Sequence, residues 1–434
     1  NVRVFDPESG MLSAPSTVTF FRDKITGVLP VEDDHAFAPE DIVVDGDGGT
    51  LVPGLHDMHS HTTMQSGLYY LAAGVTTTRD MGNNNSFLLD LMPKLEAGEL
   101  AGPRIIANGF LEGRSPFSSV HGMIPDTKEE AIRDVDWYAD HGYWQIKIYN
   151  SMNPDWVPAI VEAAKARGMT VTGHVPAFST ANDVIEKGYV EITHINQLML
   201  GWLLEPGEDT RTPLRLTGMA RAADLDLSSA PVKKTVRLMQ EHNIALDPTA
   251  VILERLMLSR AGETPPGDVD YLSHMPVGYQ RYRKRTFVKL PDAARDQAYR
   301  EAFQRILDTI SLLHENGIRL LPGTDDTTGF TVQRELELYT KAGLTPAEAL
   351  YAGTLGCAEY MGHGNDWGSI SRGKSADFFL IPGDPTQDIK AIKSIRMVVQ
   401  QGSVYFPSEI YSALSIEPFA HAPAFAPFQT EKGE

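Results

Sequence analysis

Residues 51–61 read LVPGLHDMHSH: an apolar start, a Pro-Gly break and then two histidines, His59 and His61. In an extended segment, residues i and i+2 project to the same face, so both imidazoles would point in one direction. Such a pair can coordinate a metal ion from one side. A single histidine is more often an ordinary core or surface residue than a ligand, so the metal interpretation requires further ligands at the ends of later strands.

The composition narrows the class of protein. The chain has 434 residues, a formal net charge of -19 and one cysteine, Cys357. The negative charge disfavours nucleic acids and anionic membranes, and no apolar run is long enough to cross a bilayer. One cysteine excludes an intramolecular disulfide and a multi-cysteine zinc site, which leaves histidines and carboxylates as metal ligands. We therefore expect a soluble protein that acts on a small molecule.

From residue 51 onward, short apolar runs alternate with helical patterns, as is typical of βα units around a parallel sheet. Eight such runs predict an α/β fold, a closed (β/α)8 TIM barrel over residues 51–363. They are residues 51–56, 74–80, 103–109, 144–149, 169–174, 189–195, 244–249 and 318–326.

Other segments lie outside this repeating pattern. Strand-like runs in residues 1–50 and 364–408 predict a small β-sandwich built from both ends of the chain, followed by an extended tail over 409–434. Long insertions near 197–242 and 250–316 suggest lids or packing elements. The second insertion contains the basic stretch RYRKRTFVK (281–289), which we interpret as a solvated charged face.

Polar residues fall where these strands end. In a barrel of this type the active site is built at the carboxyl ends of the strands. The candidates there are His59, His61, Lys147, His174, His194 and Asp325. Each has an ordinary alternative: Lys147 as a buried lysine paired with a carboxylate, His194 as a core histidine, Asp325 as a turn residue in PGTDD. Their coincidence at one end of successive strands favours a metal site.

A lysine is an unusual member of such a set, because an ammonium group repels a cation. Desolvation beside a cation favours the neutral amine, which could take up carbon dioxide and become an anionic carbamate. A carbamate has two oxygens and could bridge two metal ions. Lys147 is therefore expected to be N6-carboxylated.

The pattern HxH, Lys, His, His and Asp on strands one, four, five, six and eight resembles the amidohydrolase superfamily, in its binuclear branch with a carboxylated lysine. The motifs PGLHDMHSH (53–61), GVTTTRDMG (74–82), IKIY (146–149), GHVP (173–176) and THINQ (193–197) look like the prolidase-like, carboxypeptidase-like and ochratoxin-hydrolysing members. His56 and Asp326 depart from that resemblance, since Ile or Val and Ser are commoner at those places.

The resemblance implies a hydrolase that uses two divalent metal ions, expected to be zinc, and a metal-bridged hydroxide to cleave an amide bond of an N-acyl amino acid or dipeptide-like molecule. Asp325 would bind metal and transfer the proton to the leaving nitrogen. His121, in GRSPFSSVHG (113–122), would polarise the carbonyl. Tyr149 and Arg79 would help bind the substrate.

Two alternatives remain open: a cyclic-amide hydrolase or deaminase like imidazolonepropionase, and a non-catalytic binding protein on a barrel scaffold. A homo-oligomer is expected. The compartment stays open, because the chain starts at Asn1 and a removed signal peptide is one candidate explanation.

Overall fold

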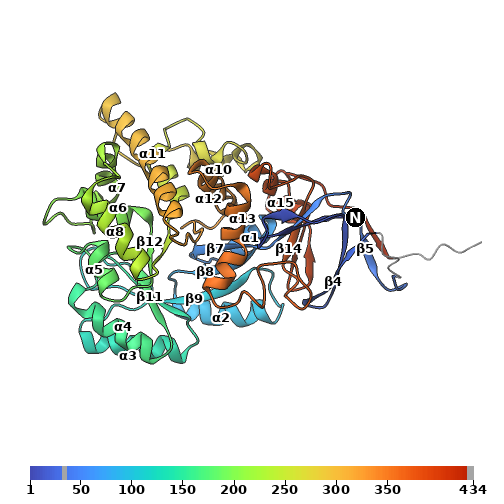
Figure 1. Cartoon of the computed structure of the whole chain (residues 1–434), viewed down its shortest axis with the longest axis horizontal. Helices are drawn as coiled ribbons and strands as arrows, with labels where there is room; N and C mark the ends of the chain where they lie inside the picture. Colours follow the sequence, from blue (N-terminus) through green and yellow to red (C-terminus); the bar gives the residue numbers. More distant parts are fainter. Residues whose placement is uncertain (32–36, 428–434) are drawn as a thin grey trace, which may run out of the picture.

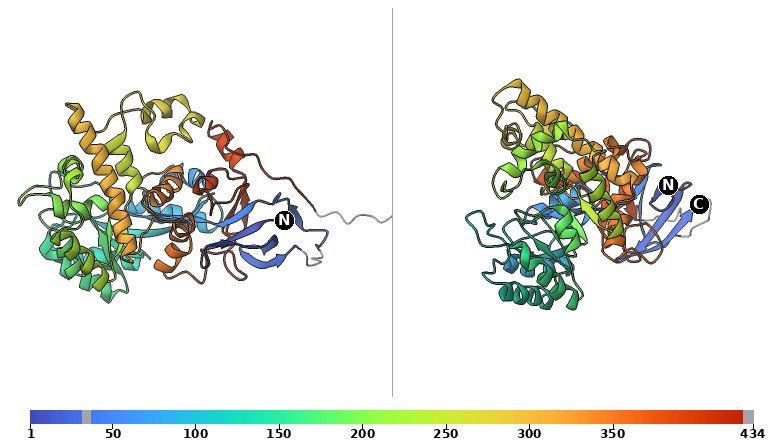
Figure 2. Two further views of the ribbon diagram at one scale, coloured as in Figure 1. Left: turned by 45° about the horizontal axis from the view of Figure 1, so that its top comes forward. Right: turned by 60° about the vertical axis from the view of Figure 1, so that its left-hand side comes forward.

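The computed structural model describes residues 1–31 and 37–427. It is a mixed α/β fold in which helices surround a curled parallel sheet, and strands from both ends of the chain gather at one end of the molecule (Figure 1). Figure 2 shows from two further directions that the strands from both ends of the chain lie apart from the curled sheet and its helices. Within these residues, no helix is long and apolar enough to span a membrane.

The curled sheet has five parallel strands in the order β11-β10-β9-β8-β7. Their bounds are β7 Leu55–Ser60, β8 Val75–Asp80, β9 Arg104–Leu111, β10 Gln145–Ile148 and β11 Thr170–Gly173. The intervening helices are α1 Ser66–Ala72, α2 Asn85–Glu96, α3 Lys128–Asp140, α4 Val157–Ala166 and α5 Ala181–Glu186. Because the strands are parallel, their carboxyl ends all meet at one edge, and the loops that follow them converge there.

Two further strands, β12 Glu191–Thr193 and β13 Ala245–Asp247, form a separate parallel pair. The Val190 N–H donates to the Val171 carbonyl at 3.0 Å and so joins this pair to the curled sheet. Residues 318–326, predicted as the eighth strand, form only one isolated bridge, between Leu320 and Leu246. Pro322 interrupts this run and has no N–H to donate.

The first predicted run, residues 51–56, is divided between two sheets at Gly54. β6 (Thr50–Pro53) joins the terminal sheet, whereas β7 starts at Leu55 in the curled sheet. A Cβ at Gly54 would lie 2.0 Å from Thr76 Oγ1, so only glycine lets the chain pass between the sheets at this point. The first strand of the curled sheet therefore begins four residues after the predicted start, and it includes His59.

The terminal sheet has six strands in the order β16-β15-β14-β6-β1-β2. Their bounds are β1 Arg3–Asp6, β2 Met11–Leu12, β14 Phe378–Ile381, β15 Met397–Gln400 and β16 Ser403–Tyr405, with β6 as above. A hairpin, β3 Ser16–Phe21 and β4 Lys24–Pro30, lies beside it, and β5 Ile42–Val44 pairs with β17 Phe425–Pro427. Both ends of the chain thus contribute strands here.

The segment expected as an extended tail from residue 409 is partly packed. It overlaps helix α15 (Pro407–Ala413), in which Tyr411 is 3% exposed and donates its hydroxyl to the Ala72 carbonyl at 3.0 Å. Residues 428–434 lie outside the described residues.

The two long insertions are helical and pack against each other. The first contains α6 Ile195–Leu203, α7 Leu214–Thr217, the 3-10 helix η2 Gly218–Asp224 and α8 Ala230–Glu241. The second contains α9 Ala250–Leu258, α10 Val277–Arg283 and α11 Ala293–Glu315, and α11 packs on η2 and α9. The last helices of this part of the chain are α12 Phe330–Lys341, α13 Pro346–Gly353 and α14 Leu355–Tyr360.

Candidate metal centre and active site

Four histidine rings gather at the carboxyl edge of the parallel strands. His59 lies near the end of β7 and His61 just beyond it, whereas His174 follows β11 and His194 follows β12. The ring centroids are 4.5 Å apart for His59 and His194, 4.6 Å for His174 and His194, and 5.4 Å for His59 and His61. The sequence-predicted histidines are therefore brought together from three strand ends.

Each of these rings is fixed through its Nδ1 atom. The partners are Asp247 Oδ2 for His59 at 2.6 Å, the Gly82 carbonyl for His61 at 2.6 Å, Asn150 Oδ1 for His174 at 2.7 Å and Thr249 Oγ1 for His194 at 2.6 Å. The oxygens of Asp247, Gly82 and Asn150 can only accept, so they place a proton on Nδ1 of their rings, and the Nε2 atoms of His59 and His174 keep a lone pair that can bind a cation. The Nε2 atom of His174 is buried and has no hydrogen-bond partner among the described residues.

Burial also keeps these imidazoles neutral, which is the form that binds a metal. It lowers the pKa of His194 to about 3 and holds the pKa values of His59 and His174 well below their ordinary value. His61 differs: burial would lower its pKa, but the hydrogen bond with Asp325 raises it overall. Three of the four rings are thus neutral at physiological pH without any metal.

Lys147, on β10, extends into the same space. Its side chain is 1% exposed, and Nζ lies 3.0 Å from His59 Nε2. Burial lowers the pKa of its amine to about 8. Within residues 1–31 and 37–427, Lys147 forms no ion pair within 4 Å. The alternative of a buried lysine paired with a carboxylate therefore finds no partner among these residues. A lysine in this setting is unusually easy to deprotonate.

Asp325 completes the cluster from the loop after residues 318–322. Its N–H donates to the His59 carbonyl at 2.8 Å, and its Oδ1 lies 3.3 Å from His61 Nε2. Although burial would raise its pKa, the hydrogen bond from His61 and the nearby positive charges hold it below its ordinary value. His59, His194 and Asp325 each offer a ligand atom within 4.8 Å of the others, so the donors present fit a divalent cation.

A pocket opens above this cluster. Its volume is about 160 Å³, and it is lined by His61, Phe110, Ser119, His121, Lys147, Tyr149, His174, His194 and Asp325. His121, whose side chain is exposed, reaches it from the loop after β9. The Tyr149 ring lies against that of His174, with ring centroids 4.0 Å apart and an interplanar angle of 40°. Both residues therefore lie beside the cluster, where the sequence-based interpretation requires them.

Arg79 does not line this pocket, which corrects the substrate-binding role expected for it. It is fully buried inside the sheet, where its Nη1 and Nη2 atoms each lie 2.6 Å from an oxygen of Glu191 and its Nε donates to the Met58 carbonyl at 2.7 Å. Its Nη2 also lies 3.8 Å from Asp247, the residue that holds His59, so Arg79 lies beneath the cluster and not in the pocket.

Arg215, from α7 in the first insertion, is the arginine beside the pocket. Its Nη1 donates to the Tyr149 hydroxyl at 3.2 Å, and it lines both an adjoining pocket of about 80 Å³ with His174, His194 and Asp325 and an outer pocket of about 430 Å³ with Phe117 and Arg211. No strand or periodic pattern marks Arg215 in the sequence, so reading strand ends could not find it. Asp247, which fixes His59, lies within the predicted run 244–249 and ends β13 in the structure, so it could have been found in that way.

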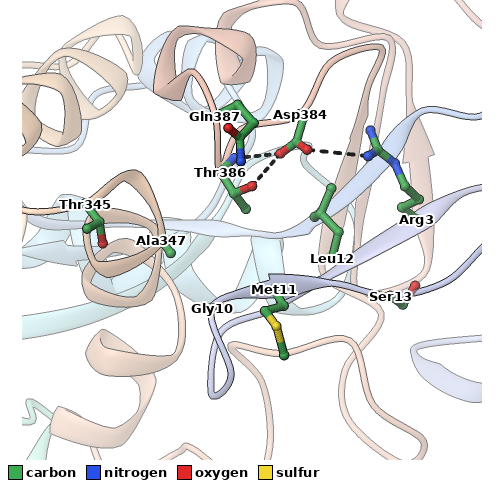
Figure 3. Close-up of a pocket in the computed structure, with 10 residues that line it drawn as sticks. All are labelled: Arg3, Gly10, Met11, Leu12, Ser13, Thr345, Ala347, Asp384, Thr386 and Gln387. Atoms are coloured by element: carbon green, nitrogen blue, oxygen red, sulfur yellow. Dashed lines mark hydrogen bonds and ion pairs between the residues drawn. The ribbon is translucent and has the colours of Figure 1, made fainter.

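A larger surface pocket, of about 510 Å³, lies elsewhere, between the terminal sheet and the start of α13 (Figure 3). Its charged groups satisfy each other: Arg3 contacts Asp384 at 3.4 Å, and the Thr386 hydroxyl donates to Asp384 at 2.6 Å. None of the described residues that line it is a histidine or cysteine. Nothing there resembles a catalytic group.

Comparison with known proteins gives the family. A model of the amidohydrolase family matches residues 50–404. The chain belongs to the amidohydrolase family. It is a hydrolase acting on amide bonds, and amidohydrolases typically bind metal, in accordance with the His59, His194 and Asp325 cluster.

Solved structures resemble this amidohydrolase over nearly its whole length. Bottromycin amidohydrolase has a TM-score of 0.71 at 20% identity, covering 97% of this chain and 91% of its own. A candidate prolidase from Bifidobacterium longum has 0.68 at 22%, covering 95% and 96%. A Xaa-Pro dipeptidase with bound methionine has 0.65 at 18%, covering 93% and 98%. A search of curated proteins gave no match. At these identities the likeness establishes the fold alone.

Proposed function

We propose that this amidohydrolase is a metal-dependent enzyme that cleaves the amide between an acyl or aminoacyl group and an amino acid with a free carboxylate. The observation that carries the proposal is the set of four imidazoles whose Nδ1 atoms are engaged and which gather beside Asp325 and Lys147. The names of two structural neighbours, a candidate prolidase and a Xaa-Pro dipeptidase, support a dipeptide-like substrate.

The residues that would hold two divalent cations are His59, His61, Lys147, His174, His194 and Asp325. Nitrogen and oxygen ligands suit zinc, and Lys147 would contribute as a carbamate, for which its lowered pKa provides neutral amine. When bound, such ions polarise a carbonyl and make hydroxide available near neutral pH. The proposed complete (β/α)8 barrel would bring these ligands to one rim, and backbone hydrogen bonds from residues 321–325 to β13 and β7 support its closure.

The remaining chemistry belongs to side chains. Asp325, ionised at neutral pH because its pKa is held low, would accept the proton of the attacking water and pass it to the leaving nitrogen, since an amine leaves poorly without one. His121 reaches the pocket from the exposed side and would donate a hydrogen bond to the scissile carbonyl. Tyr149 lies between the metal-binding side and Arg215, in a position to orient the substrate.

Arg215 takes the role of carboxylate recognition that the sequence suggested for Arg79. It forms no ion pair within 4 Å among the residues that the structure describes. Glu112, the carboxylate whose charge it influences, is already engaged by the N–H groups of Gly113, Ser119 and Ser151. A guanidinium that faces a pocket and lacks a carboxylate partner is suited to bind one from a substrate.

The test compares kcat/KM for an N-acyl amino acid, or an Xaa-Pro dipeptide, with that for its C-terminal amide. If Arg215 binds the carboxylate, losing that charge costs on the order of 1.5–3 kcal/mol, a factor of roughly 10 to 150. Arg215→Met abolishes the preference. Arg221→Met is the matched control, because Arg221 belongs to the same insertion but pairs with Glu208 at the surface.

Equal rates on acid and amide in the wild type would contradict carboxylate recognition. Activity confined to lactams would instead favour the cyclic-amide hydrolase alternative, for which the metal-ligand proposal could still hold.

A further inference from the structure

Asp326, the residue after Asp325, is held by two arginines from the second insertion. Its Oδ2 lies 3.3 Å from Arg255 Nη1 and 3.2 Å from Arg283 Nη1. The Asp326 side chain is 9% exposed and that of Arg283 only 2%. Charges this far from solvent are screened little, so the contact constrains both partners.

Arg283 is fixed from its other side as well. Its Nε and Nη2 each donate to Asp268 at 2.7 Å, and the Tyr271 hydroxyl donates to the same carboxylate at 2.8 Å. Arg283 was expected on a solvated face with the rest of the basic stretch 281–289. That expectation is wrong for this residue, because it is buried and its charge is balanced by two carboxylates, Asp268 inside the insertion and Asp326 outside it.

Arg255 is held by packing rather than by a second carboxylate. It lies on α9, with its guanidinium carbon 5.4 Å from the ring centroid of Tyr282 and 5.2 Å from that of Phe287. Both rings come from the same basic stretch. The insertion therefore grips Asp326 from two of its segments, one on α9 and one on α10.

These contacts reach the loop that carries Asp325. Asp325 has a φ of 52°, a conformation that non-glycine residues adopt only when their surroundings enforce it. On one side, Thr324 donates its hydroxyl to Asp57 Oδ2 at 2.7 Å. On the other side of Asp325, among the residues that the structure describes, Asp326 holds the loop through its ion pairs with Arg255 and Arg283.

We propose that Asp326, Arg255 and Arg283 form a latch through which the second insertion positions Asp325. They are positioning residues, because none of them lines the pockets around the histidine cluster. The expected effect of the latch on kcat rests on the proposed function. Its effect on the order of residues 324–328 does not depend on that function.

The first test is Asp326→Asn in the full chain reconstituted with zinc. Asparagine keeps the shape but leaves two guanidiniums without a neutralising carboxylate at this end. Hydrogen exchange of the amides in residues 324–328 should accelerate by about ten-fold or more. kcat should fall by about ten-fold or more, while KM stays within about three-fold, because the pocket walls are unchanged.

Arg255→Gln is the second variant, chosen because its side chain is 13% exposed and its loss threatens folding less. It should accelerate exchange in the same five residues, and combining it with Asp326→Asn should add little, because both remove one contact. Arg281→Ala, at an exposed position on α10, is the control and should leave both exchange and kcat unchanged.

Wild-type exchange of residues 324–328 in Arg255→Gln would overturn the latch, whatever the folding state of Asp326→Asn. Faster exchange there, in a protein whose wild type hydrolyses no amide, would support the latch and contradict the proposed function instead.

Discussion

Asp325 unites several of the constraints found in this molecule. Its backbone is left-handed, its N–H is bound to the His59 carbonyl, and its carboxylate contacts His61. Its lowered pKa keeps it ionised, so it is suited both to bind a cation and to carry a proton. The two roles can be separated by a substitution that removes the charge of the Asp325 side chain but keeps its volume.

Asp325→Asn should therefore keep most of its bound metal but lose turnover by a factor of about 10² to 10⁴, the usual range for losing a general acid–base group. The measurement is kcat on the best amide substrate together with elemental analysis of the same sample. Near-normal turnover in a metal-loaded variant would exclude the proton-transfer role.

The grouping of the candidate ligands could be predicted from the sequence, because the carboxyl ends of parallel strands meet on one rim. Five of the six candidate ligands line one pocket with His121 and Tyr149, and the sixth, His59, lies 3.0 Å from Lys147. Arginines could not be sorted in this way. Tertiary packing decides which arginine faces the pocket: it directs Arg79 toward Glu191 and Arg215 toward Tyr149.

At the scale of elements, the pair Arg79 and Glu191 joins β8 of the curled sheet to β12 of the separate pair. Both side chains are fully buried and bind through two short contacts. Removing one partner of a buried ion pair leaves an uncompensated charge, which costs much more than losing a surface pair.

Glu191→Gln should accordingly lower the free energy of unfolding by about 3–5 kcal/mol, measured from the urea midpoint. Asp90→Asn, which removes an exposed partner of Lys94 on α2, should change it by less than about 0.5 kcal/mol. If Glu191→Gln altered KM while leaving stability intact, Arg79 would be a substrate group after all.

Element types were easier to predict than their partners. Runs that alternate with helical patterns gave seven of the expected strands within a few residues. The split at Gly54 escaped prediction because it depends on a distant contact, the close approach of Thr76. The irregularity of residues 318–326 had a local signal in Pro322, which has no N–H to donate to a strand partner.

At the scale of the whole molecule, a strongly acidic chain of net charge -19 surrounds a cluster with Lys147, Arg215 and four histidines. Bound metal ions together with Arg215 would give this cluster a local positive field, which can attract an anionic substrate despite the overall charge. The metal content decides whether that cluster acts as proposed.

The most direct test counts the metal ions bound per chain after reconstitution with zinc and bicarbonate at about pH 9, because the amine of Lys147, with a pKa of about 8, is largely neutral there. The wild type should approach two ions per chain, and Lys147→Met should lose most of its affinity at one position. A wild-type value that stays near one, or a Lys147→Met variant that binds as much zinc as the wild type, would contradict the two-metal site.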